Sequence, residues 1–489
     1  MSISFNQIPI DIRVPGQYIE FDNSRAQQGL PAMPHKILVI GQRLVAGTVL
    51  AGVPTRILSA DQAQNNFGRG SMLHTMLRAL RNANNYTECW AVALDENVAG
   101  VAAIGSINAT APPTAAGTLN FYIGGNRVQV AITATQTAAQ VATAIAAAVN
   151  AVTDLPVTAA VDGVITSKVN LTCRWKGETG NSIDLRLNYY QGETLPTGLA
   201  FTLTAMTGGT SNTDVSTAIA AIGAEQYNTI IMPYVDTANL TALETELSNR
   251  WGPLVMKEGQ AFAAAAGTFS AIDTLGAAQN SPFVTIMGAQ GSPTTPWEIA
   301  AVTGAVDAYE PDPARPRQTL TLTGVLAPWT QDRYTLDERN IHLHDGISTF
   351  IVDAGGNALI ERLITTYQTN ALGVQDISYL DIETMRTLAY IRYSIRSRIA
   401  LKFPRHKLAD DGTHFGPGQA IVTPKIIRAE LIALFRQWED AGLAEDIDQF
   451  KTDLLVQRDG TDPNRVDAVI PPNIINQFRV FAGQVQFRL

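Results

Sequence analysis

Apolar runs that suit buried strands alternate with helical patterns in two stretches of the chain. From His35 the run KILVI indicates a strand, SMLHTMLRALRNANN has the spacing of an amphipathic helix, and ECWAVAL indicates a second strand. After residue 225 the alternation resumes with the strands TIIMPY, QAFAAAA and FVTIMGA and the helices NLTALETELSNRW, FSAIDTLGAAQ and PWEIAAVTGAVDAY. Near-continuous apolar strands separated by helices predict a parallel sheet covered on both faces.

A different pattern separates these two stretches. Residues from about 98 to 212 are rich in Ala, Thr and Gly, and apolar positions alternate strictly with polar ones in 119–123 and again in 128–132. Gly124 and Gly125 lie between them and supply the positive φ of a two-residue turn, so this part predicts a β-hairpin. Further expected elements are a small helix over Ala138 to Asn150 and strands around VNLTCRW and IDLRLNYY.

After Asp353 the pattern becomes helical. The segment GGNALIERLITTYQTN is predicted to be a helix, and a long helix is expected from Ser378 to Phe403. Thr423 can cap a further helix, Pro424 suits its first turn, and Gly442 lies where it would end.

A chain of 489 residues exceeds what one hydrophobic core usually organises. We therefore expect a multidomain α/β fold with an α/β core, a mostly β insertion, an α+β C-terminal domain and extended terminal arms. The predicted parts are an N-terminal arm (1–22), the core (23–97 and 213–353), the insertion (98–212), the C-terminal domain (354–463) and a C-terminal linker with a strand arm (464–489).

Both ends of the chain have the alternation of short strands, although termini are usually frayed. Ile3 and Phe5 alternate with serines, and Val485, Phe487 and Leu489 alternate with polar residues. One interpretation is that each arm packs on its own subunit. The alternative is that each arm pairs with a neighbouring subunit by strand exchange.

Composition narrows the function. Hydrophobic residues make up 46% of the chain and charged residues 16%, which predicts a folded protein, and the net charge of -9 disfavours nucleic-acid binding. Cys89 and Cys173 lack CxxC spacing and are expected to be buried thiols. The first residues lack the pattern of a secretory signal, and no apolar run approaches the length of a membrane-spanning helix, so we expect a protein that stays inside its producing cell without membrane insertion.

A search for catalytic and cofactor motifs finds little. His342 and His344 would point the same way on a strand, and such pairs do bind metals, but no third ligand has a suitable spacing. The segment GTSNTD at 209–214 is weakly similar to the serine loop of subtilisin-like proteases, without a convincing Asp and His pair. The glycine-rich runs fit no nucleotide motif. We expect no catalytic residues, no metal and no cofactor.

One basic segment stands out in this acidic chain. Between residues 386 and 407 there are basic residues and no acidic ones: Arg386, Arg392, Arg396, Arg398, Lys402, Arg405 and Lys407. Arg392 and Arg396 share a helix face, where like charges repel unless an anionic partner is near. The segment is either a solvated face with local ion pairs to Glu383 and Asp381, or a surface for an acidic neighbour.

Three segments resemble the tail sheath proteins of Mu-like phages: IRVPGQYIEFDNSRA, GGNALIERLITTYQTNALGVQDISYLDIETMRTLAYIRYSIR and the closing PPNIINQFRVFAGQVQFRL. The resemblance covers nearly the whole chain. It implies a subtilisin-like α/β domain without protease chemistry, an outward-facing insertion and a C-terminal domain that lines the inside of the sheath. It also implies that terminal strands join the C-terminal domain of a neighbouring subunit. The matching positions here are Ser2, Ile3, Ser4, Phe5, Phe478, Val480, Val485, Phe487 and Leu489.

The resemblance implies a structural subunit rather than an enzyme. Such a subunit polymerises as a helical cylinder around a tail tube and contracts to drive the tube through the host envelope for genome ejection. The implied partners are other copies of the chain, the tail tube protein, and the baseplate and tail terminator proteins, in a virion tail assembled in the host cytoplasm. Two alternatives remain at this point: the sheath of an R-type bacteriocin or related injection machine, and a metal-dependent hydrolase that uses His342 and His344.

Overall fold

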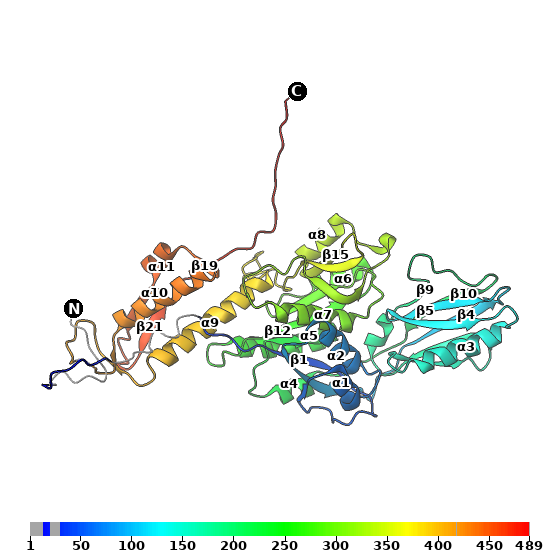
Figure 1. Ribbon diagram of the computed structural model, residues 1–489, viewed down its shortest axis with the longest axis horizontal. Helices are drawn as coiled ribbons and strands as arrows, with labels where there is room; N and C mark the ends of the chain where they lie inside the picture. The colour runs from blue at the N-terminus through cyan, green and yellow to red at the C-terminus, as the bar shows by residue number, and fades with distance from the viewer. Residues whose placement is uncertain (1–12, 20–29, 417, 489) are drawn as a thin grey trace. The chain divides into compact units, whose positions relative to one another are not determined.

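The computed structural model describes residues 13–19, 30–416 and 418–488, and these fall into two compact units (Figure 1). The larger unit contains residues 35–311 and 317–382. The C-terminal unit contains residues 383–488 together with 312–316 and the described residues before His35. The mixed α/β fold expected from the sequence is present.

A mostly parallel sheet forms the centre of the larger unit. Its strand order is β14-β16-β15-β13-β12-β11-β1-β3-β2. The parallel strands are β1 (Lys36–Gln42), β3 (Glu88–Leu94), β11 (Thr229–Ile231), β12 (Gln260–Ala265), β13 (Val284–Gly288) and β15 (Ile347–Val352). The antiparallel strands at the edges are β2 (Thr55–Ile57), β14 (Thr321–Leu326) and β16 (Asn357–Arg362). The central strands are buried, as their apolar runs predict.

Helices cover both faces of this sheet because its connections run in two directions. The step from β1 to β3 goes one way, and the steps from β11 through β12 to β13 go the other, so right-handed crossovers place their helices on opposite faces. The helices of this unit are α1 (Ala60–Phe67), α2 (Met72–Ala83), α4 (Ser216–Ile222), α5 (Thr237–Trp251), α6 (Phe269–Ala277), α7 (Pro296–Tyr309) and α8 (Leu336–His344), with a short turn η2 (Thr330–Asp332). Helix α7 packs on α2 and is buried along nearly its whole length.

The insertion is built from two small antiparallel sheets and one helix, seen beside each other in Figure 1. One sheet contains β10 (Ala200–Thr207), β4 (Ile104–Ala111), β8 (Lys168–Cys173) and β7 (Val157–Val161), and the other contains β6 (Asn126–Ile132), β5 (Gly117–Ile123) and β9 (Leu185–Leu187). The helix is α3 (Ala138–Ala151), and a turn η1 spans Glu178–Ser182. The predicted hairpin is confirmed: Phe121 pairs with Val128, and Gly124 and Gly125 have φ values of 54° and 77°.

The predicted helix over GGNALIERLITTYQTN is wrong. Its first part is β16, which pairs with β15 in a hairpin, and the rest has no helix. Ala358 and Ile360 are buried on alternate positions, which is the period of a strand. Asp353 and the left-handed Gly356 close the turn, because the Asp353 carboxylate accepts from the backbone N–H of Asn357 at 2.8 Å. The domain boundary expected after Asp353 therefore falls inside this hairpin, and the compact unit extends to Ile382.

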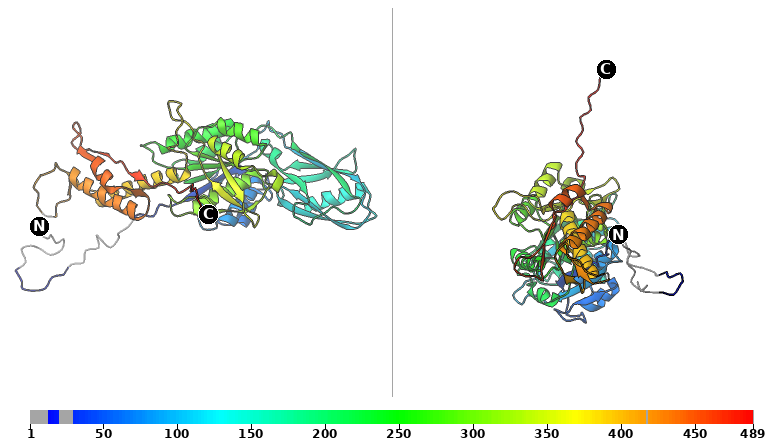
Figure 2. Two further views of the ribbon diagram at one scale, coloured as in Figure 1. Left: turned by 90° about the horizontal axis from the view of Figure 1, so that it is seen from above. Right: turned by 90° about the vertical axis from the view of Figure 1, so that its left-hand side faces the viewer.

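Two long helices form the frame of the C-terminal unit, and they lie side by side in Figures 1 and 2. They are α9 (Ile382–Lys402) and α10 (Pro424–Asp440); the other elements are α11 (Ile447–Asp453), β17 (Lys407–Leu408), β18 (Ile421–Val422), β19 (Ala444–Glu445), β20 (Leu455–Arg458), β21 (Val466–Val469) and β22 (Asn473–Ile474). Thr423 caps α10 as predicted, since its side chain accepts from the N–H of Ile426. The core of the unit gathers around Trp438 and Phe435, and the Trp438 indole donates to the Ser394 hydroxyl at 2.9 Å.

Two further expectations concern the burial of the cysteines and the absence of membrane-spanning helices. Cys89 and Cys173 are buried free thiols, as predicted, and burial raises the pKa of each to about 12. Along the described chain, no helix is both long and apolar enough to cross a membrane.

Candidate functional site

The C-terminal arm, residues 475–488, contains no helix or strand, and from Phe478 onward its large apolar side chains face solvent. Phe478 is 73% exposed, Val485 90% and Phe487 80%. Several large exposed apolar side chains in one segment are a feature typical of protein interaction sites. The predicted arm residues Ser2 to Phe5, and also Leu489, lie outside the described residues.

The root of this arm is attached to the C-terminal unit. Strand β22 pairs with β19, and the N–H of Ile475 donates to the carbonyl of Leu443 at 3.1 Å. Two residues after the arm begins, the Gln477 amide lies 3.5 Å from the carbonyl of Ala314. Arg479 then forms an ion pair with Glu383 at 2.8 Å, and the Glu383 side chain is fully buried. The arm is therefore attached to its own C-terminal unit as far as Arg479.

The hairpin of β20 and β21 offers an open sheet edge on the same unit. The two strands pair from Leu455 opposite Val469 to Arg458 opposite Val466. Val456 packs on the core of the unit, whereas Leu455 and Val469 are exposed. Among the described residues no third strand pairs with this hairpin, so it has two open sheet edges.

The predicted basic segment does not form one continuous surface. Arg386 is buried in α9, Arg392 is half-buried, and Arg396 is exposed. Arg398 binds Glu430 of α10 at 2.8 Å and also contacts the Gln437 amide, while Lys402 lies 3.9 Å from Glu430. Arg405 and Lys407 follow the helix and are exposed. Of the two acidic residues considered as partners, Asp381 binds Arg362 at 3.0 Å and Glu383 binds Arg479 at 2.8 Å.

The histidine pair is on a helix rather than a strand. Two residues along α8 rotate a side chain by about 200°, so His342 and His344 point to opposite sides. His342 is fully buried against Phe269 and Tyr334, and burial lowers its pKa, while His344 is exposed. No group of three His, Cys, Asp or Glu side chains suited to a metal occurs among the described residues.

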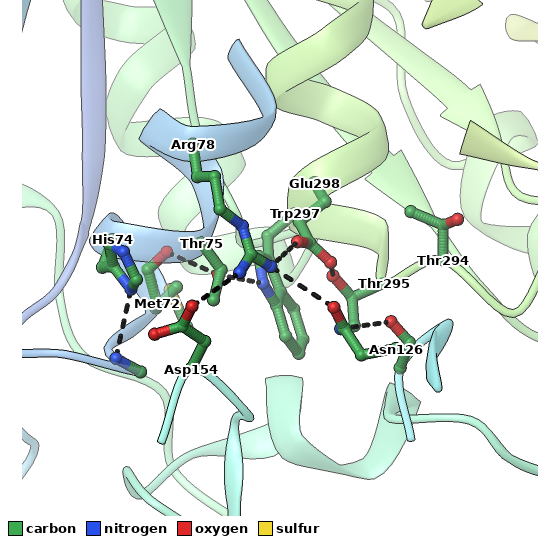
Figure 3. A network of polar contacts seen from close by, with 12 residues as sticks. Met72, His74, Thr75, Arg78, Asn126, Asp154, Thr294, Thr295, Trp297 and Glu298 are labelled. Atoms are coloured by element: carbon green, nitrogen blue, oxygen red, sulfur yellow. Dashed lines mark hydrogen bonds and ion pairs between the residues drawn. The ribbon is translucent and has the colours of Figure 1, made fainter. Parts of the chain in front are cut away.

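A polar network joins the insertion to the α/β core (Figure 3). Arg78 of α2 lies at its centre: its guanidinium is 3.4 Å from the Asp154 carboxylate and 3.5 Å from the Glu298 carboxylate. The same group lies 3.4 Å from the amide oxygen of Asn126, the first residue of β6. Thr295 donates to Glu298 at 2.6 Å. Burial raises the pKa of Glu298, and the charge of Arg78 opposes this shift.

Aromatic contacts strengthen the same junction. Trp175 of the insertion meets Trp297 of α7 edge to face at 5.3 Å, and the Trp297 indole donates to Thr75 of α2. Elsewhere, the Tyr189 hydroxyl donates to the carbonyl of Ala327, and its ring stacks with Trp329. The residues of this junction are far apart in the chain and match no motif, so no pattern in the sequence predicts it.

The segment 209–214 that is weakly similar to a serine loop has structural contacts instead. The Asn212 amide donates to Asp236 at 2.8 Å, and the Thr213 hydroxyl accepts from Gln42 at 2.9 Å. Ser211 has a left-handed φ of 60°. These contacts tie the end of the insertion to the carboxyl end of the parallel sheet.

Comparisons with known proteins relate the chain to tail sheath proteins. The family model described as phage tail sheath protein central domain matches residues 208–366, and the model described as phage tail sheath C-terminal domain matches residues 374–488. The chain is 46% identical to the Mu-like prophage FluMu tail sheath protein of Haemophilus influenzae over 491 residues, with 100% of both chains covered.

Solved structures of sheath proteins are also similar. The sheath tail protein of Desulfitobacterium hafniense has 15% sequence identity and a TM-score of 0.48, with 94% of this chain and 100% of that chain covered. The helical sheath of the anti-feeding prophage in its contracted state has 14% identity and a TM-score of 0.45, with 98% of this chain and 99% of that chain covered.

Proposed function

Because the chain belongs to the phage tail sheath protein family, we propose that it polymerises as a helical cylinder around a tail tube and contracts to drive the tube through the host envelope for genome ejection. The family consists of structural proteins of contractile tails, so the prediction that the chain is not an enzyme is confirmed. The hydrolase alternative required two histidines on one side, and helix α8 separates them.

The observation that carries the proposal is the exposed C-terminal arm. Residues 480–488 place apolar side chains in solvent beyond the last anchored residue, Arg479. Burying them against a second copy removes that surface from water, and each Å² of buried apolar area stabilises the contact by about 25 cal/mol. A single subunit gains nothing from such an arm, whereas a polymer gains a connection at every copy.

The receiving surface in this proposal is the β20–β21 hairpin of a neighbouring subunit. An added strand would satisfy the unpaired backbone groups at its edge, and the exposed Leu455 and Val469 would give apolar contacts to alternate side chains of the arm. The N-terminal arm, with Ile3 and Phe5, is assigned the same role. The linker before the arm lets subunits stay connected while rigid domains move. The connection itself is formed by main-chain pairing, which demands no single side-chain geometry.

The energy for contraction is assigned to the interfaces between subunits. The chain has no nucleotide motif, so an extended cylinder must be metastable and the contracted form must bury more surface. Assembly on the tube, nucleated at the baseplate and closed by terminator proteins, would store this energy in the host cytoplasm. The exposed part of the basic segment, with Arg396, Arg405 and Lys407, is assigned to an acidic surface of the tube or of an adjacent subunit.

The domains take separate roles in this proposal. The parallel core with its buried helix α7 is the subtilisin-like domain without protease chemistry, the insertion faces outward, and the C-terminal unit lines the inside. The sheath of an R-type bacteriocin or related injection machine would use the same parts, and whether a genome-filled head is attached distinguishes the two cases.

Negative-stain microscopy of the concentrated purified protein tests the proposal. We expect hollow cylinders from the wild type. Deleting Val485 to Leu489 should leave a soluble subunit with an unchanged melting temperature that forms no cylinders, because the side chains of Val485 and Phe487 are exposed in the single subunit. A matched control replaces Gln484 and Gln486, on the polar positions of the arm, with serine and should polymerise normally. Normal cylinders from the truncated chain would show that the arm is not the connection.

A further inference from the structure

Two segments far apart in the chain, Pro31–Ala32 and the region of Arg479, contact the same helix. On the N-terminal side, the Tyr390 hydroxyl donates to the carbonyl of Pro31 at 3.0 Å, and the Tyr393 hydroxyl donates to that of Ala32 at 3.1 Å. On the C-terminal side, the Arg479 guanidinium binds the Glu383 carboxylate at 2.8 Å. All of the helix residues in these contacts belong to α9.

The two attachment points are close together on a rigid element. Glu383 lies in the first turn of α9, and Tyr390 and Tyr393 lie seven and ten residues further along. At about 1.5 Å of rise per residue, the two roots are roughly 10 to 15 Å apart along the helix axis. The helix itself is fixed in the unit, because Ser394 accepts from the buried Trp438 indole and Ile391 packs in the core.

The Glu383–Arg479 pair is a largely buried ion pair at the C-terminal root. The Glu383 side chain has no exposed surface and that of Arg479 is 14% exposed, so the two charges attract in a poorly screened environment. Losing either partner would leave a buried charge without this counter-ion, which is costly. Immediately beyond Arg479, Val480 and Phe481 are about four-fifths exposed. The pair thus marks the point where the anchored chain ends.

We propose that α9 is a common anchor for both arms, and that Glu383 and Arg479 are positioning residues that fix where the C-terminal arm leaves the subunit. A pull on one arm is then passed through this single helix to the other arm, rather than through the α/β core. The role in the polymer rests on the proposed sheath function, while the anchoring is a property of the isolated subunit. The two can therefore be tested separately.

Hydrogen exchange of the full-length unassembled subunit tests the anchoring. In the Arg479→Ala and Glu383→Gln variants, amides of Asn473 to Ile475 should exchange about tenfold faster, which corresponds to about 1.4 kcal/mol of local stability. Arg479→Lys keeps the charge and should restore most of the protection. Arg488→Ala removes an exposed arginine of the same arm and should change nothing. Unchanged exchange in both anchor variants, or equal loss in Arg488→Ala, would overturn the positioning role.

Assembled cylinders test the shared anchor. Arg479→Ala on the C-terminal side, and the double variant Tyr390→Phe and Tyr393→Phe on the N-terminal side, should each assemble and then break into shorter pieces on contraction. The phenylalanines keep the ring packing and remove only the two hydroxyl contacts. If the cylinders of only one of these two variants break on contraction, α9 is not a common anchor. If the wild type forms no cylinders while the exchange result holds, the sheath proposal fails and the anchoring stands.

Discussion

The imidazole of His74 accepts a hydrogen bond at Nδ1 from the backbone N–H of Gly70, at 3.1 Å. The side chain is 3% exposed in the first turn of α2, and burial, together with the nearby Arg78, lowers its pKa to about 4. A protonated Nδ1 could not accept this bond, so the folded chain holds the neutral ring.

This contact predicts a loss of stability in acid. An unfolded histidine takes up a proton near pH 6.5, but folded His74 does so only near pH 4. The unfolded state therefore binds more protons between these values, and the free energy of unfolding should fall as the pH falls, by up to about 3 kcal/mol. Urea unfolding at a series of pH values from 7.5 to 4 measures this fall in the free energy of unfolding. In His74→Gln this component should vanish, and parallel pH curves for the two proteins would contradict the assignment.

The junction around Arg78 should be important for stability. Arg78→Met would leave the buried Glu298 carboxylate without its counter-ion and cost about 2 to 3 kcal/mol, less than for a wholly buried pair because Arg78 is 26% exposed. Adding Glu298→Gln should recover more than half of this loss, since the uncompensated charge is gone. Denaturant unfolding of the single and double variants gives both values. A double variant no more stable than Arg78→Met would show that the charge of Glu298 is not what Arg78 balances.

The basic segment predicts an effect on the balance between extended and contracted sheath rather than on the folding of the subunit. Single exposed pairs contribute about 0 to 1 kcal/mol, but the same contact recurs at every subunit of a helix. Reversing Arg392 and Arg396 to Glu should leave a folded subunit and yield empty, already contracted sheaths. High salt should make extended wild-type sheath scarcer on tubes. Electron micrographs scored for the two forms measure both effects.

Arg398 of the same segment tests a contact within the subunit. Arg398 binds Glu430 within the same unit, so Arg398→Glu should place two carboxylates together and lower the melting temperature of the subunit itself. If the double reversal at 392 and 396 builds extended tails at the normal yield, the segment is a solvated or internally paired face.

The histidines predict no metal dependence. Elemental analysis of the purified protein should find no stoichiometric transition metal, and a chelator should leave the melting temperature unchanged. His344→Ala should have no effect on assembly, because the side chain is exposed. His342→Ala should assemble as well but melt earlier, because it opens a cavity between α6 and α8. One zinc ion bound per chain would reopen the enzyme alternative.

Local patterns determined much of the architecture. The apolar run at KILVI, the Gly124–Gly125 turn and the Thr423–Pro424 start of α10 each specify their element within a few residues, and each is found where it was predicted. The apolar alternation of Val485 and Phe487 is also a local property of the sequence, and the pairing of this arm with a neighbouring subunit stays a prediction. The error at GGNALIERL has a local origin too: an apolar period close to that of a helix hid a hairpin turn closed by Asp353.

What only the tertiary structure decided is which distant groups meet. Arg78, Asp154 and Glu298 come from three segments, and Glu383 and Arg479 are 96 residues apart, so no spacing in the chain could pair them. The same holds for the basic segment, whose charges are equivalent in sequence but differ in burial, from the buried Arg386 to the exposed Arg396. The reason is physical: periodicity records whether a side chain faces solvent or core along one element, while charge pairing depends on which other element packs against it.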